Sequence, residues 1–382
     1  MAVIKLDSGY NIGVPPESCS FVNRPEPEPV RRAPVSQNKA LPELSIVSTG
    51  GTIASRIDYR TGSVTSQSDA AAILSAIPEL TTVANYTTRS IYTILSENMT
   101  PQIWQELARA VFEEIKRGVT GVIVTHGTDT MAYSAAALSF MVDTPVPIVL
   151  VGSQRSADRP SSDNAMNAVC AAKAATSDLG EVAVVMHATT NDDFCTIHRG
   201  TRVRKMHTSR RDAFQSIGMP PLGTVEYPSL KINLDSDAAR RNTHEPALHD
   251  KLDPQCAILY FHPGMTPDIL DAYQEYHGIV LSGTGLGHVS TTLIPGLRNL
   301  VEGGTEVMMT SQCLHGKVCD RVYDTGRDLL AAGVIEGGDI LPEVALVKMM
   351  WVLGNEPNRT KRQELLRSNL RGECMGRSFH GL

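Results

Sequence analysis

Two apolar, strand-like runs that each end in a turn of glycine and threonine constrain this fold more than any other feature. Residues 44–47 lead into the sequence TGGTIA at 49–54, and residues 121–124 lead into THGTDTM at 125–131. Ligands of open α/β sheets bind beyond the carboxyl ends of the strands. We therefore expect both turns to line one polar pocket, in which a threonine rather than a cysteine or a metal ion supplies the chemistry.

Strand-like and helix-like segments alternate through the rest of the chain, which predicts βαβ units and mainly parallel sheets. A helix is expected over residues 129–141, directly after the second turn. The chain has 382 residues, whereas a single hydrophobic core usually stops growing at about 250–300 residues. We therefore predict two α/β domains, a larger catalytic one at residues 44–240 and a smaller one at 255–382, joined by a segment rich in Pro, Asp, Asn and His.

Residues 1–43 differ from the rest of the chain and are expected to form a short N-terminal extension. Residues 1–12 are predicted to supply one strand and a turn. The prolines that follow exclude a helix and indicate an extended connector. The segment fits a linker, and the alternative is the remnant of a small β domain that precedes the enzyme.

Composition limits the kinds of partner and compartment. The formal net charge of −6 argues against binding of polyanions through the overall charge, which leaves a local basic patch or a partner protein for that role. The seven cysteines show no CxxC spacing, so we expect neither a disulfide framework nor a zinc site. The sequence has no apolar run near the roughly 18 residues of a membrane span and no signal-peptide pattern, which predicts a soluble, cytoplasmic protein without membrane contact.

Thr52 is the candidate nucleophile of the first turn. A threonine hydroxyl needs a neighbour that takes its proton, and Tyr59, seven residues further on, is the candidate acceptor. Gly51, together with Gly50, allows close approach of the backbone and offers N–H groups to an oxyanion. The competing explanation of this motif is a threonine with a purely structural role at the end of a strand.

Thr128 and Asp129 supply a second hydroxyl and a carboxylate. In the functional interpretation Asp129 orients an amino group, and in the structural one it caps the following helix. Lys205 is the candidate amine, because an ammonium drawn into a small pocket beside Asp129 can relay protons and position Thr128. The alternative is a solvated basic stretch, since the neighbours of this lysine include Arg199, Arg202, Arg204, Arg210 and Arg211.

Ser96 and Glu97 lie where a strand ends and a helix begins, and they are candidates for binding the α-amino and α-carboxylate groups of an amino acid. Gly127 is a further candidate substrate contact in the second turn. Helix capping by Asn98 or Thr100 is the alternative for the first of these segments. The sequence GTGLGH at 283–288 lacks the GxGxxG spacing of a dinucleotide site, and the histidines show no paired spacing typical of metal ligands.

Taken together, residues 49–54, Tyr59 and residues 125–131 closely resemble the two signature segments of the L-asparaginase/glutaminase family. Lys205 matches the lysine of that family in order and context, and the resemblance extends from about residue 44 to 352. It implies two α/β domains and amide hydrolysis through an acyl-enzyme. It also implies two threonine-centred groups: Thr52 with Tyr59, and Thr128 with Asp129 and Lys205.

Within that family, a narrower resemblance points to the D-type subunits, or glutaminase subunits, of archaeal glutamyl-tRNA(Gln) amidotransferases. It rests on residues 152–163, 283–288, 310–313, 323–330 and 341–354. It implies a protein that releases ammonia from glutamine and passes it to the E-type subunit of the amidotransferase, which uses ATP and magnesium to activate the glutamate on tRNA(Gln). This chain itself is then expected to bind no cofactor, to meet the charged tRNA mainly through the partner, and to form a homodimer.

One departure from that pattern concerns the N-terminus. These glutaminase subunits usually carry a small β-barrel domain before the catalytic core, and here only residues 3–13 resemble its last strand. Two other functions compete with the leading one. A free-standing L-asparaginase would share the chemistry without partner or tRNA, and a non-catalytic α/β binding module would use the same pocket without turnover.

Overall fold

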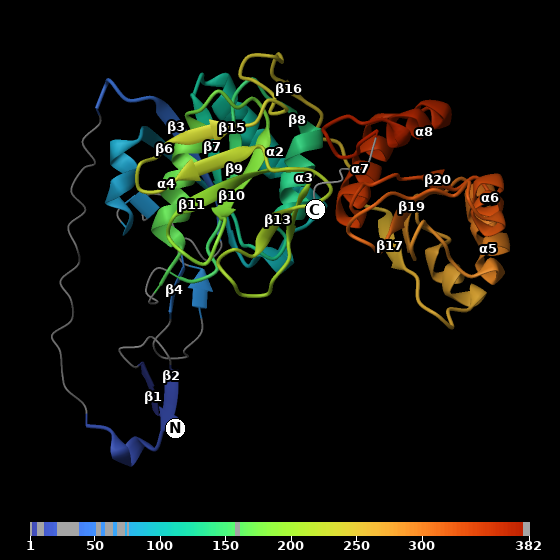
Figure 1. Cartoon of the computed structure of the whole chain (residues 1–382), viewed down its shortest axis with the longest axis horizontal. Helices are drawn as coiled ribbons and strands as arrows, with labels where there is room; N and C mark the ends of the chain where they lie inside the picture. The colour runs from blue at the N-terminus through green and yellow to red at the C-terminus, as the bar shows by residue number, and fades with distance from the viewer. Residues whose placement is uncertain are drawn as a thin grey trace.

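An eight-stranded sheet forms the centre of the larger part of the molecule (Figure 1). The computed structural model describes residues 2–5, 11–20, 38–50, 55–57, 64–66, 73–74, 76–156 and 161–376. In spatial order this large sheet consists of β15 (Ile232–Leu234), β14 (Gly223–Glu226), β11 (Phe194–Arg199), β10 (Val182–His187), β9 (Ile148–Val151), β7 (Gly121–Thr125), β3 (Glu43–Gly50) and β6 (Asn85–Ile94). The strands from β10 to β6 pair in parallel, whereas β11, β14 and β15 pair antiparallel.

Both faces of the large sheet are covered, which explains why its strands are almost continuously apolar. Along β7, Val122 and Val124 pack in one hydrophobic cluster with helices α2 (Pro101–Lys116) and α3 (Met131–Met141). Ile123, between them, points to the opposite cluster, which contains α4 (Asn164–Ala175). The 3-10 helix η3 (Pro78–Thr82) also packs on that second face through its buried leucine.

A second, four-stranded parallel sheet forms the C-terminal part, at the orange and red end of the chain (Figure 1). This small sheet consists of β17 (Cys256–Tyr260), β18 (Gly278–Gly283), β19 (Glu306–Ser311) and β20 (Ile335–Glu336). Its helices are η5 (Pro267–Tyr273), η6 (Thr291–Leu293), α5 (Ile294–Glu302), α6 (Asp324–Ala331), α7 (Pro342–Asn355) and α8 (Arg359–Arg367). The segment at η5 forms a 3-10 helix.

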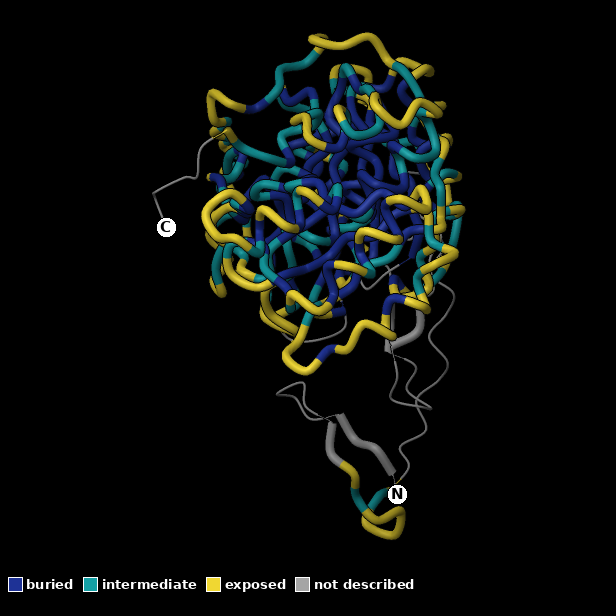
Figure 2. The backbone as a smooth tube through the Cα atoms, turned by 90° about the vertical axis from the view of Figure 1, so that its right-hand side faces the viewer, coloured by how far each residue is buried: buried dark blue, intermediate teal, exposed yellow. Residues whose placement is uncertain are grey.

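Helix α7 joins the two parts because it packs against α3 of the large sheet. Phe140 of α3 stacks on Trp351 of α7, with ring centroids 6.0 Å apart. The same hydrophobic cluster continues through Val344 and Val347 into the small sheet. In Figure 2 the buried positions lie toward the middle of the molecule, and the exposed positions lie mostly on its outer loops.

The remaining elements are short. The N-terminal segment contains an antiparallel pair, β1 (Ala2–Lys5) with β2 (Asn11–Val14). The segment therefore has two strands, whereas only one was predicted. The other short elements are η1 (Pro16–Ser18), β4 (Ser55–Ile57), β5 (Val64–Ser66), η4 (Ser96–Asn98), β8 (Val142–Asp143), β12 (Val203–Lys205), β13 (Phe214–Ser216) and β16 (Ala247–Leu248). Among the described residues, no helix has both the length and the apolar composition needed to cross a membrane.

Candidate active site

The carboxyl ends of four parallel strands bring the predicted segments to one edge of the large sheet. Ser48 of β3 lies opposite Thr125 of β7, and β9 lies on the other side of β7. Thr49 donates a hydrogen bond from its hydroxyl to the Thr125 carbonyl, at 3.0 Å, and so ties the ends of the two strands together. Ser96 follows β6, the remaining neighbour of β3. The two turns therefore begin side by side, as their positions after parallel strands predict.

Lys205 connects the second turn to a separate hairpin. Its ammonium nitrogen donates to the hydroxyl oxygen of Thr128 at 2.9 Å and to a carboxylate oxygen of Asp129 at 2.8 Å. Lys205 ends β12, which pairs with β13. The lysine side chain is 14% exposed and that of Asp129 is 68% exposed, whereas Thr128 is buried. The three side chains thus form one cluster in which the amine is shielded while the carboxylate faces solvent.

The capping alternative for Asp129 was wrong. Helix α3 begins at Met131, two residues later than expected, and Thr130 occupies the N-cap position without a capping side-chain hydrogen bond. The carboxylate of Asp129 instead accepts from Lys205. Thr130 donates its hydroxyl hydrogen bond to the carbonyl of Ser96 at 2.7 Å, which joins this turn to the end of β6.

The solvated basic stretch, the alternative proposed for Lys205, does not describe the lysine itself, whose side chain is 14% exposed, although that of Arg210 in the same stretch is 54% exposed. Each arginine near the lysine pairs with its own carboxylate, and these carboxylates come from several distant segments. The pairs are Arg199 with Glu181, Arg202 with Asp339, Arg204 with Glu343, Arg210 with Asp212, and Arg211 with Asp192. The arginines are therefore neutralised individually, and Lys205 is the cation of this stretch that meets Asp129.

His126 lies directly beneath the threonine turn and is fully buried. Its Nδ1 lies 2.7 Å from the Gly127 carbonyl, which can only accept, so Nδ1 carries the proton. Its Nε2 then accepts from Ser134 at 2.7 Å, and Ser134 accepts from the indole N–H of Trp104 at 2.8 Å. Burial lowers the pKa of His126 to about 4. This histidine is therefore a neutral support for the turn rather than a base near neutral pH.

A pH dependence of stability follows from a second buried histidine, His198 of β11, whose pKa burial lowers to about 3. Between that value and the ordinary pKa of about 6.5, the unfolded chain binds a proton that the folded chain does not. Stability is therefore lost as the pH falls through this window. The unfolding free energy should therefore decrease less steeply between pH 6 and 4 in the His198→Gln variant. The slope is expected to be smaller by up to about 1.4 kcal/mol per pH unit.

Urea unfolding at several pH values measures this slope. Replacing the exposed His244→Gln provides the matched control and is expected to leave the slope unchanged. An identical pH slope for the His198 variant and the unmodified protein would contradict the prediction.

A buried carboxylate that the sequence analysis did not single out holds the turn after β9. Asp163 accepts from the hydroxyl of Ser153 at 2.8 Å and from the backbone N–H groups of Gln154 and Arg155 at 2.9 Å. Asn167 adds a fourth hydrogen bond to this carboxylate, also at 2.9 Å. The turn is thereby fixed against the threonine cluster. Asp163 occupies the N-cap position of α4, and an aspartate at a helix start by itself indicates only a cap.

Gly152, at the start of that turn, leaves no space for a side chain. An added Cβ would lie 2.7 Å from the backbone oxygen of His126 and 2.9 Å from the Thr128 methyl carbon. Replacing Gly152→Ala is expected to lower the free energy of unfolding by about 1–3 kcal/mol, the usual cost of overpacking. Urea unfolding measures this cost. Gly376→Ala, where an added Cβ meets nothing within 4 Å, is the control and is expected to stay near the unmodified protein.

The other predicted site residues lie at different places. Ser96 is buried and Glu97 is exposed on the 3-10 helix η4. A Cβ at Gly127 would lie 2.7 Å from the Cβ of Ser96, so the glycine allows these two segments to touch. Thr52, Gly51 and Tyr59 lie outside the described residues. Among the residues that the structure describes, no three His, Cys, Asp or Glu side chains group so that they could hold a metal ion.

Comparison with known families gives a match over most of the chain. Residues 43–238 match the model described as asparaginase, N-terminal, and residues 255–366 match the model described as glutaminase/asparaginase C-terminal domain. The D-type subunit of the glutamyl-tRNA(Gln) amidotransferase of Methanosarcina mazei is 57% identical over 389 residues, which cover 97% of this chain and 91% of that protein. The protein of the same name from Archaeoglobus fulgidus is 54% identical, with 97% of this chain and 88% of the relative covered.

Solved structures give the same picture of the fold. The thermostable L-asparaginase from Thermococcus kodakarensis superimposes with a TM-score of 0.78 at 33% identity, over 88% of this chain and 100% of that one. L-asparaginase I from Vibrio cholerae gives a TM-score of 0.76 at 28% identity, over 88% of this chain and 99% of that one. The predicted fold class, with two mainly parallel α/β sheets, is confirmed.

Proposed function

The chain belongs to the L-asparaginase/glutaminase family, and from this membership we propose that it is the glutamine-hydrolysing subunit of a glutamyl-tRNA(Gln) amidotransferase. The choice between an amidotransferase subunit and a free-standing L-asparaginase rests on sequence identity, which is higher to the relatives of the first kind. Relatives named as the D-type subunit of that enzyme are 57% and 54% identical over almost the whole chain. The L-asparaginase from Thermococcus kodakarensis is 33% identical. An amidohydrolase that works within the amidotransferase therefore fits better than a free-standing L-asparaginase.

In the proposed reaction, the hydroxyl oxygen of Thr52 attacks the side-chain amide carbon of glutamine while Tyr59 accepts the hydroxyl proton. The N–H groups of the glycine turn, including that of Gly51, stabilise the negative charge on the amide oxygen. The carbon–nitrogen bond then breaks, and the nitrogen takes up a proton and leaves as ammonia. Water hydrolyses the resulting ester, which releases glutamate and restores Thr52.

The cluster around Lys205 supports the second set of roles. Its amine touches both the Thr128 hydroxyl and the Asp129 carboxylate, at 2.9 and 2.8 Å. An amine in contact with a hydroxyl can exchange a proton with it, and the adjacent carboxylate holds the ammonium in place. We assign proton transfer and substrate positioning to this group of three. Ser96, Glu97 and Gly127 are assigned to the α-amino and α-carboxylate ends of the substrate.

The relatives are named as one subunit of a larger enzyme, so the chain is part of a multi-subunit amidotransferase. The proposed partner is the E-type subunit, which would use ATP and magnesium to activate the glutamate on tRNA(Gln) and would receive the ammonia. The tRNA would then be contacted mainly through that partner, in agreement with the negative net charge of this chain. A homodimer in the cytoplasm, where charged tRNA is made, completes the proposal.

Ammonia release from glutamine and from asparagine tests the assignment, measured for the chain alone and for the chain with its partner and glutamate-charged tRNA(Gln). We expect glutamine to be preferred and its hydrolysis to be stimulated by the partner and the charged tRNA. Strong hydrolysis that needs no partner and prefers asparagine would contradict the proposal and identify a free-standing L-asparaginase. Absence of hydrolysis with both substrates would indicate a binding module.

A further inference from the structure

Arg202, three residues before Lys205, is fully buried yet charged. Its guanidinium donates three hydrogen bonds: from Nε to the Gly372 carbonyl at 2.9 Å, from Nη1 to the Asp339 carbonyl at 3.0 Å, and from Nη2 to the Asp339 carboxylate at 3.0 Å. All three acceptors come from the C-terminal part of the chain. A buried guanidinium satisfied in this way is held in one orientation.

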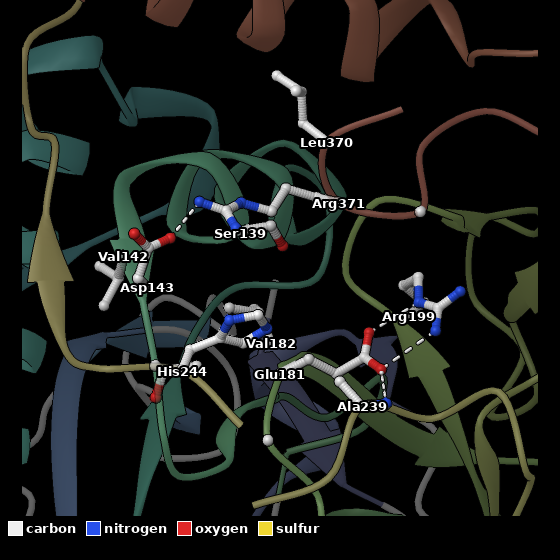
Figure 3. Close-up of a pocket in the computed structure, with 13 residues that line it drawn as sticks. Ser139, Val142, Asp143, Glu181, Val182, Arg199, Ala239, His244, Leu370 and Arg371 are labelled. Atoms are coloured by element: carbon white, nitrogen blue, oxygen red, sulfur yellow. Dashed lines mark hydrogen bonds and ion pairs between the residues drawn. The ribbon is translucent and has the colours of Figure 1, made fainter. Parts of the chain in front are cut away.

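The chain segment 370–375, here called the C-terminal strap, supplies one of these acceptors and lies beside the large sheet. Figure 3 shows Arg371 of the strap reaching Asp143 of β8, beside a cavity of about 250 Å³. The strap is also anchored to the C-terminal part, because Glu373 pairs with Lys348 of α7 at 2.7 Å with both side chains fully buried. Strap and α7 therefore form one anchored unit.

One further contact connects this unit directly to the hairpin that carries Lys205, and a second ties the strap to Asp339, the partner of Arg202. Thr201 donates from its hydroxyl to the Arg371 carbonyl at 2.9 Å. The other carboxylate oxygen of Asp339 accepts from the backbone N–H of Met375 at 2.8 Å, so one aspartate holds both the strap and Arg202. The hairpin is thus tied to the strap immediately before the strand of the lysine begins.

Strand β12 is short, so the contacts of Arg202 lie close to Lys205 and affect its position. The strand has three residues, Val203–Lys205. Val203 is fully buried in the core, and Arg204 pairs with Glu343 of α7 at 3.5 Å. A displacement at Arg202 is therefore passed on to the lysine within one short, stiff strand.

We propose that Arg202 is a positioning residue for Lys205: Asp339 and the C-terminal strap hold its guanidinium, and thereby align the lysine amine with Thr128 and Asp129. The role of Lys205 in catalysis rests on the function proposed above. The placement of the C-terminal part against the large sheet then sets the geometry of the amine. Misplacement of a catalytic group by about 1 Å can cost about a hundredfold in rate.

The test compares two amide substitutions of buried carboxylates that each pair with an arginine. Asp339→Asn weakens the bond to Arg202, whereas Glu306→Gln weakens a pair with Arg359 at 3.3 Å that does not touch β12. Thr201→Val is a milder second variant, which removes only the hydroxyl bond to the strap. We measure kcat and KM for glutamine, together with the pH profile of acetylation of the Lys205 amine by acetic anhydride, followed by peptide mass spectrometry.

We expect Asp339→Asn to lower kcat about tenfold and Thr201→Val about threefold, with KM changed less than about twofold, and to shift the acetylation profile of Lys205. Glu306→Gln is expected to keep both kcat and the profile of the unmodified protein. Unchanged kcat and acetylation in Thr201→Val and in Asp339→Asn, or an equal loss in Glu306→Gln, would overturn the proposal. The acetylation comparison needs no substrate, so it decides this inference even where glutamine hydrolysis fails.

Discussion

Replacing Lys205 by methionine is expected to lower kcat for glutamine hydrolysis by about a thousandfold, the middle of the usual range for a group that transfers protons. Methionine preserves much of the length and apolar stem of the side chain while it removes the amine. Both the Thr128 hydroxyl and the Asp129 carboxylate then lose their shared donor. Ammonia release under saturating glutamine measures the effect.

Arginine at this position is not expected to restore activity. Its larger, planar guanidinium does not fit the place of a single amine nitrogen between the Thr128 hydroxyl and the Asp129 carboxylate, and it does not give up its proton. Lys231→Met is the matched control, since that lysine is 66% exposed on the turn before β15 and pairs with Glu226. It is expected to keep normal activity. A Lys205→Met enzyme that stays within tenfold of the unmodified kcat would refute the assigned role.

Replacing Thr52 by alanine is expected to lower kcat by about ten-thousandfold or more, because no other group can then form the ester with the substrate. The same measurement of ammonia release applies. Binding of glutamine, followed by calorimetry, is expected to survive, because the hydroxyl is needed for bond formation rather than for recognition of the amino-acid end.

Thr144→Ala is the matched control for this substitution. Thr144 is a buried threonine, and its hydroxyl bonds to the Val146 carbonyl in the turn before β9, away from the threonine cluster. It is expected to cost stability without a comparable loss of kcat. Equal losses of kcat in both variants would mean that the effect of Thr52→Ala reflects folding.

The features that could be predicted from the sequence are those with a local cause. Apolar strand runs and their alternation with helices depend on neighbouring residues, and they predicted the fold class. Helix capping by Thr100, given above as an alternative for the segment at Ser96, does occur: its side chain caps α2, whose first residue is Pro101. The meeting of two turns at one sheet edge follows from the parallel arrangement alone.

The features that escaped prediction depend on residues far apart in the chain. Arg202 meets a carbonyl 170 positions away, which no local pattern indicates. The pairing of Asp129 with Lys205, 76 positions away, was predicted, but only beside the alternatives of a capping aspartate and a solvated lysine. No local pattern distinguishes a capping aspartate from one that binds a lysine, or a solvated arginine from a buried one. The chain must first be folded for Asp339 and Glu343 to meet the arginines next to Lys205.

The central claim is that Thr52 is the nucleophile of an amidase site completed by Thr128, Asp129 and Lys205. Labelling with a diazoketone analogue of glutamine, followed by peptide mass spectrometry, tests it most directly. The account predicts covalent label on Thr52, formed in step with loss of glutaminase activity and slowed by glutamine and by Lys205→Met. Label on another residue, or inactivation without label on Thr52, would contradict it.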